Sequence, residues 1–243
     1  GLALTLCGGT ALPVTDRWFP YLGGEYLPRW ASIALLALAG AGAVFAVVKA
    51  YRARKAYGMA AGLPGLCLGL AGKLAALGFL AWVFLSYLGI PVPVALFAVV
   101  ALAGYFLLQH TRFGRSLYAI GGNEEAARLS GLNVFRTKLL VYTLMSGLAA
   151  LAGIILASRL NGASPNLGNM AELDTIAAVV IGGTSLSGGS GTIAGSLVGT
   201  FLIGVMDNGM SLLEVNDFYR LMVKGAIIIL AVWFDVTSRR KRG

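Results

Sequence analysis

A glycine-rich stretch, Gly182-Gly-Thr-Ser-Leu-Ser-Gly-Gly-Ser-Gly191, has the composition of a loop that could cradle a phosphate. In a Walker A loop, backbone amides surround the phosphates and a lysine reaches the terminal one. Here Gly189 stands where the lysine is required, and no lysine occurs between residues 139 and 223. We therefore expect no nucleotide site. The glycines are expected instead to break a helix, to allow close helix contact, or to line a transport pathway. The residues concerned are Gly182, Gly183, Gly188, Gly189 and Gly191.

Side chains capable of catalysis do not form a recognisable set. The single histidine, His110, has no nucleophile motif such as G-x-S-x-G around it. No acidic pair lies within an apolar segment, and Asp207, at the end of one, is the nearest candidate for a proton relay. Cys7 and Cys67 lack the spacing of a metal site. The sequence thus predicts no enzyme activity, no cofactor and no metal.

The polar segment 110–138 contains the clearest local signal for a short helix. Asn123 can cap a helix start, and Glu124 and Glu125 in the first turn complement the positive end of the dipole. Gly131 can end the helix in a left-handed conformation. A helix of about two turns is expected from Glu124 to Ser130. On composition alone, it could be an ordinary surface helix that links two longer ones.

The elements around these motifs must be membrane-spanning helices. The chain has 243 residues, of which 58% are hydrophobic and 12% charged, whereas soluble domains have about 25% charged residues. Apolar windows of about 17–25 residues indicate spans. Six are expected: Trp30–Val48, Leu74–Ile90, Val94–Gln109, Leu139–Ser158, Thr192–Met206 and Leu221–Phe234. The fold class is therefore all-α, a polytopic transmembrane helical bundle.

One apolar run is too short to cross a membrane. Thr175–Ile181, directly before Gly182, has seven residues. A helix of about seven residues is only about 10 Å long, whereas the hydrocarbon core of a membrane is about 30 Å thick. We expect a broken or re-entrant element, or a helix completed by less hydrophobic residues on either side. In the next span, Gly195 and Gly199 form a small-xxx-small face, which could pack within one subunit or between two.

The net charge of +9 indicates orientation. Segments 49–58, 110–138 and 239–242 hold four, five and four basic residues, 13 of the 19 in the chain. Short loops rich in Lys and Arg face the cytoplasm. These three segments, and with them the C-terminus, are therefore expected inside. Seven of the ten acidic residues then face outward. The aromatic residues are scattered, so the charge does not indicate nucleic-acid binding.

Two long motifs carry a resemblance to a known family. Glu125-Ala-Ala-Arg-Leu-Ser-Gly131 reads as E-A-A-x-x-x-G and resembles the coupling-helix motif of permease subunits in ATP-binding-cassette (ABC) importers. The surrounding segment 114–133 and the segment 172–191 are similar to the monosaccharide branch, which includes ribose, galactose, arabinose and xylose permeases. The match covers about residues 105–236, and the segments 10–29 and 49–58 look most like xylose permeases.

This resemblance implies a single transmembrane permease domain over residues 1–243, with a cytoplasmic coupling loop at 110–138. It implies a bacterial inner-membrane protein that translocates a monosaccharide, such as the pentose xylose. The partners would be a cytoplasmic ABC ATPase, an external sugar-binding protein and a second permease subunit, as in a homodimer. The ATPase-coupling residues would be Asn123, Glu124, Glu125, Ala126, Ala127, Arg128 and Gly131.

Two further expectations concern length and mechanism. Permeases of this family have additional N-terminal spans, so the sequence is expected to be the C-terminal portion of a longer subunit. A different class of function, a secondary carrier or channel that works without an ATPase, remains open because interrupted helices such as the one near Gly182 often form transport sites.

Overall fold

The computed structural model describes residues 12–13, 19–56, 72, 75, 78–79, 81–86 and 88–240. The chain divides into two compact units. One unit contains Ala98–Ala157 and Ala163–Gly243, and the other contains Pro13–Phe97 and Ser158–Gly162. Two short strands, β1 (Leu12–Pro13) and β2 (Gly162–Ala163), pair with each other.

The smaller unit contains α2 (Phe19–Gly24), α3 (Arg29–Ala56) and the start of α5 (Val92–His110). Hydrogen bonds join the start of α3 and the residues before it to the segment that leads into α5. The fully buried Ser32 hydroxyl accepts a hydrogen bond from the Ile90 amide at 3.1 Å. The Leu27 amide donates to the Ile90 carbonyl at 2.9 Å. These bonds satisfy backbone groups that would otherwise lose hydrogen bonds on burial. They fix where α5 begins, directly after the helix-breaking Pro91.

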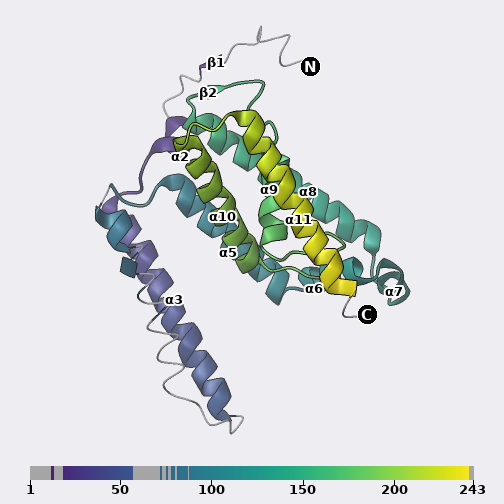
Figure 1. Ribbon diagram of the computed structural model, residues 1–243. Coiled ribbons are helices and arrows are strands. Elements are labelled where there is room, and N and C mark those ends of the chain that lie inside the picture. The colour runs from purple at the N-terminus through teal and green to yellow at the C-terminus, as the bar shows by residue number, and fades with distance from the viewer. Residues whose placement is uncertain are drawn as a thin grey trace. The chain divides into compact units, whose positions relative to one another are not determined.

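The larger unit holds most of the residues singled out by the sequence. After the later part of α5 come α6 (Arg112–Gly122), α7 (Glu124–Leu129), α8 (Val134–Arg159), α9 (Ala171–Ile181), α10 (Ile193–Leu212) and α11 (Asp217–Arg240), labelled in Figure 1. Within the described residues, three helices are long and apolar enough to cross a membrane: α5, α8 and α10. The chain is thus a multi-pass helical membrane protein.

The predicted spans agree with these helices to different degrees. The predictions at 94–109, 139–158 and 192–206 are confirmed by α5, α8 and α10. The prediction at 30–48 lies within α3, and the one at 221–234 lies within α11. Within the prediction at 74–90, residues 75, 78–79 and 81–86 are helical, and residues 74, 76–77, 80 and 87 lie outside the described residues.

Helix α9 is the short element that the sequence predicted, and less hydrophobic residues do extend it. It has 11 residues, which rise about 16 Å, or half the hydrocarbon core. Its packing partners are α10 and α11, and Figure 1 shows it beside both. Ala177 and Ala178 of α9 and Ile203 of α10 form the buried core between them.

Small residues allow α9 and α10 to approach closely. A Cβ atom at Gly199 would overlap the carbonyl oxygen of Ala178, and one at Gly195 would overlap the carbonyl oxygen of Gly182. The small-xxx-small face is therefore used for packing inside the chain. This contact resolves the two alternatives that the sequence left open for Gly195 and Gly199.

Candidate functional site

Helix α7 is present as the sequence predicted and ends one residue earlier, at Leu129. Asn123 caps its start, because the side-chain Oδ1 accepts a hydrogen bond from the Ala126 amide at 2.9 Å. The Asn123 amide also donates to the Ala119 carbonyl at the end of α6, at 3.0 Å. One residue therefore ends α6 and begins α7. The joint between the two helices contains no flexible linker.

The end of α7 has the full hydrogen-bond pattern of a Schellman motif. The Gly131 amide donates to the Arg128 carbonyl at 3.0 Å, and the Leu132 amide donates to the Ala127 carbonyl at 3.1 Å. Gly131 has φ +83°, the left-handed conformation that glycine adopts without steric cost. Although α7 spans only six residues, its end is thus defined by the backbone.

The side chains of α7 differ sharply in exposure. Ala127 is buried, with 5% of its surface exposed, whereas Ala126 and both glutamates are exposed. Leu129 is 85% exposed. Replacing Ala127 would therefore disturb packing inside the chain rather than an outer surface. Leu129, which the sequence analysis did not single out, is the large apolar side chain that α7 exposes.

A hollow lies beside α7, between it and the first turn of α8. It is lined by Glu124, Arg128, Leu132, Asn133, Val134, Phe135 and Lys138. Phe135 is 76% exposed. The Lys138 ammonium lies 2.7 Å from Glu124, and both side chains are about half exposed. A pair this exposed contributes at most about 1 kcal/mol to stability. The surface around α7 thus combines exposed apolar groups with charges of both signs.

Helix α6 was missed by the sequence analysis, which described 110–138 as a polar segment with one short helix at 124–130. Thr111 caps its start, because its hydroxyl accepts from the Gly114 amide at 3.2 Å. The backbone of Gly114 packs against Leu108 so closely that a Cβ atom would overlap the Leu108 carbonyl. The signals available were this capping threonine, this glycine, and the apolar Leu117 and Ile120 at a spacing of three residues.

The glycine-rich loop after α9 contains the turn expected from its residue types. Gly183, Gly188 and Gly189 have φ values of +81°, +89° and +76°, a region that side chains rarely enter. Gly182 caps α9 and Thr192 caps α10. A Cβ atom at Gly191 would lie 2.8 Å from the Thr184 side chain. The five glycines thus shape a compact turn between two helices. Their role in a transport pathway stays a prediction.

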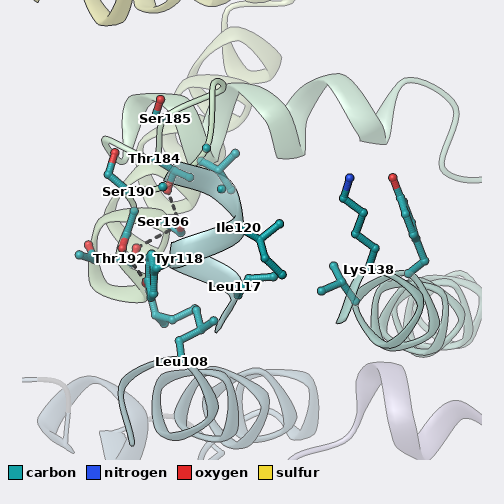
Figure 2. Close-up of a pocket in the computed structure, with 18 residues that line it drawn as sticks. Leu108, Leu117, Tyr118, Ile120, Lys138, Thr184, Ser185, Ser190, Thr192 and Ser196 are labelled. Carbon is teal, nitrogen blue, oxygen red and sulfur yellow. Dashed lines mark hydrogen bonds between the residues drawn. The ribbon is translucent and has the colours of Figure 1, made fainter. Parts of the chain in front are cut away.

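A cavity of about 510 Å³ lies next to this loop. Figure 2 shows Leu117, Tyr118 and Ile120 of α6, residues of the glycine-rich loop and Lys138 of α8 around it. Leu108, Val141, Val179 and Ile193 add apolar walls. Hydroxyl groups also line it, so the lining mixes apolar side chains with polar groups from Tyr118, Thr184, Ser185, Ser190, Thr192 and Ser196.

Three charged side chains meet between α9, α10 and α11. The Lys224 ammonium lies 2.6 Å from Asp174 and 3.0 Å from Asp207. Lys224 is only 13% exposed, and the two carboxylates are about one-third exposed. The sequence analysis considered Asp207 alone and found no acidic pair, because Asp174 is 33 positions away in the sequence. Asp207 therefore shares Lys224 with Asp174, and the cluster joins three helices.

Comparison with known proteins gives the family. The family described as branched-chain amino acid transport system / permease component matches residues 73–232. The xylose transport system permease protein XylH of Escherichia coli K12 is 42% identical over 243 residues, covering 99% of this chain and 62% of that protein. The XylH protein of Haemophilus influenzae is 51% identical over 156 residues, 64% of this chain and 42% of that protein.

The ribose import permease protein RbsC of E. coli K12 is also similar, with 52% identity over 148 residues that cover 61% of this chain and 46% of RbsC. No solved structure matches the chain significantly. The chain therefore spans less than two thirds of the length of these relatives. The chain belongs to the family of branched-chain amino acid transport system permease components.

Proposed function

We propose that this chain forms part of the permease subunit of an ABC importer, which moves a monosaccharide across the bacterial inner membrane. The observation that carries the proposal is α7, a helix capped at both ends that offers the 85% exposed Leu129 beside a hollow. Among the residues described, none forms a metal-binding group. The energy for uptake would come from a separate ATPase subunit that grips α7.

The sugar is proposed to be a pentose, because the relatives that align with the chain are named as xylose and ribose permeases. By the same reasoning, an external binding protein would deliver the sugar, and a second permease subunit would complete the pathway as a homodimer. The coupling residues Asn123, Glu124, Glu125, Ala126, Ala127, Arg128 and Gly131 would act in two ways. Asn123, Ala127 and Gly131 would fix the helix, and the exposed members would touch the ATPase.

The orientation follows the charge distribution. The segments 110–138 and 239–242 would lie in the cytoplasm with the ATPase, because Lys and Arg concentrate in cytoplasmic loops. The cluster of Lys224, Asp174 and Asp207 would then lie toward the outer side, near the loop before α9 and the loop after α10.

The test compares two leucines of similar exposure on the permease subunit that contains this chain. Leu129→Asp is expected to abolish ATP-driven uptake of radiolabelled xylose or ribose by membrane vesicles that also contain the neighbouring ATPase and binding protein. Leu213 is 77% exposed after α10, and Leu213→Asp is the control expected to retain uptake.

The alternative function predicts the opposite dependence on energy. A secondary carrier, suggested by the half-length α9, would take up sugar along a proton or sodium gradient without ATP. Gradient-driven uptake in vesicles depleted of ATP, unaffected by Leu129→Asp, would overturn the ABC importer proposal. Uptake that strictly requires ATP, and that disappears in the Leu129→Asp variant, would eliminate the secondary carrier.

A further inference from the structure

The end of α6 touches the glycine-rich loop backbone to backbone. A Cβ atom on Gly121 would lie 2.5 Å from the Gly189 amide nitrogen. A Cβ atom on Gly188 would lie 2.7 Å from the Gly121 carbonyl oxygen, and one on Gly189 would lie 2.9 Å from the Gly122 Cα. Real Cβ atoms do not approach other atoms so closely. The contact therefore depends on glycine on both sides.

A hydrogen bond joins the same two elements one helical turn away. The Tyr118 hydroxyl on α6 donates to the Gly191 carbonyl at 2.9 Å, and Figure 2 shows this side chain reaching the loop near Thr192. Two attachment points prevent α6 from pivoting on the loop about a single contact. A displacement of α6 therefore moves the loop with it.

On its other side, α6 is not packed against α8. The cavity of about 510 Å³ lies between Ile120 of α6 and Lys138 of α8, which Figure 2 shows on opposite sides of the open space. Helix α6 is thus held firmly by the glycine-rich loop and loosely by α8.

The contact is connected to helix ends in both directions. Toward the proposed ATPase, Asn123 joins the last turn of α6 to the first turn of α7. Toward the membrane, the loop leads from the Gly182 cap of α9 to the Thr192 cap of α10. The backbones of α9 and α10 meet at Gly182 and Gly195.

We propose that the contact of Gly121 and Tyr118 with the glycine-rich loop transmits movement from α7 to the α9–α10 hairpin, so that ATP hydrolysis is coupled to sugar movement. This inference rests on the proposed function, because it requires an ATPase that moves α7. Gly121 and Tyr118 are positioning residues. They act through the hairpin and not through contact with sugar or nucleotide.

The matched variants are Gly121→Ala and Gly122→Ala. These neighbours end the same helix, but a Cβ atom on Gly122 meets nothing within 4 Å. Tyr118→Phe is the milder third variant, since it removes only the hydroxyl that donates to the Gly191 carbonyl. Each is placed in the complete permease subunit and reconstituted in proteoliposomes with the ATPase and the sugar-loaded binding protein.

Three quantities are measured: ATPase binding, ATP hydrolysis with and without the loaded binding protein, and sugar uptake per ATP hydrolysed, with xylose and ribose as probes. We expect Gly121→Ala to keep ATPase binding and basal hydrolysis, and to lose about tenfold in uptake per ATP, the size of a typical coupling energy between sites. Tyr118→Phe should show a smaller loss of the same ratio. Gly122→Ala should behave as the unchanged protein. A merely structural defect would lower all three quantities together.

The outcomes separate this inference from the proposed function. If the unchanged subunit does not bind the ATPase, the proposed function fails and the transmission fails with it. Two results would overturn only the transmission, provided that the unchanged subunit binds the ATPase and couples ATP hydrolysis to uptake. In the first, Gly121→Ala and Tyr118→Phe both keep the normal uptake per ATP. In the second, Gly121→Ala and Gly122→Ala lower this ratio equally. Should Gly121→Ala fail to assemble, Tyr118→Phe decides the question alone.

Discussion

Replacing Lys224 by methionine is expected to destabilise the protein by about 3 kcal/mol. The change removes the cation that lies within 3.0 Å of both Asp174 and Asp207, while it keeps a side chain of similar length. The two carboxylates then lie within about 6 Å of each other, close enough for like charges to repel. At an effective dielectric constant of about 20, that repulsion amounts to about 3 kcal/mol. Because both carboxylates are partly exposed, this free-energy loss is at the low end of the range found when one partner of a buried ion pair is removed.

The assay is thermal unfolding of the detergent-purified subunit. For a protein of this size, about 3 kcal/mol corresponds to a fall in Tm of about 6–12 °C. Lys138→Met is the matched control, because Lys138 also pairs with a carboxylate at 2.7 Å but is about half exposed. Its pair contributes at most about 1 kcal/mol. The control should therefore lower Tm by no more than about 4 °C.

A second variant separates charge repulsion from lost packing. Adding Asp207→Asn to Lys224→Met leaves one carboxylate in place of two, so more than half of the lost Tm is expected to return. The reasoning is refuted if Lys224→Met and Lys138→Met lower Tm equally. It is also refuted if Asp207→Asn makes the Lys224→Met protein less stable still.

Two further predictions concern helix packing and the helix cap. Gly199→Ala is expected to lower Tm clearly because its methyl would overlap the Ala178 carbonyl, whereas Gly204→Ala in the same helix meets nothing within 4 Å and should leave Tm unchanged. Thermal unfolding of the two variants decides the matter, and equal effects would contradict the close contact of α9 and α10. Asn123→Ala removes the acceptor for the Ala126 amide and should cost about 1 kcal/mol locally. Faster hydrogen exchange confined to α6 and α7 would support this, and unchanged exchange there would contradict it.

The membrane-spanning elements could be predicted because each rests on a property of its own residues. Apolar length alone locates α5, α8 and α10. Helix α7 could be predicted for a similar reason, since its cap Asn123 and its terminator Gly131 are adjacent to it in the sequence. These elements can be recognised because the residues that define each of them are close together in the sequence.

The contacts between distant segments could not be predicted in the same way. Asp174, Asp207 and Lys224 come from three helices, and nothing in the residue types says that they meet. Gly121 and Gly189 have no side chain that would indicate a partner, although their backbones touch. The exposure of Leu129 also depends on how α7 packs, because the periodicity of a six-residue helix does not define a buried face.

Site-specific photo-crosslinking from α7 tests the central claim most directly. A photoreactive amino acid would replace Leu129 in the permease subunit, in membranes that actively take up sugar. Leu213, which is similarly exposed and lies at the C-terminal end of α10, is the control position. The proposed importer predicts a crosslink from position 129 to the ABC ATPase and none from position 213. Transport-competent membranes that give no ATPase crosslink from position 129 would contradict it.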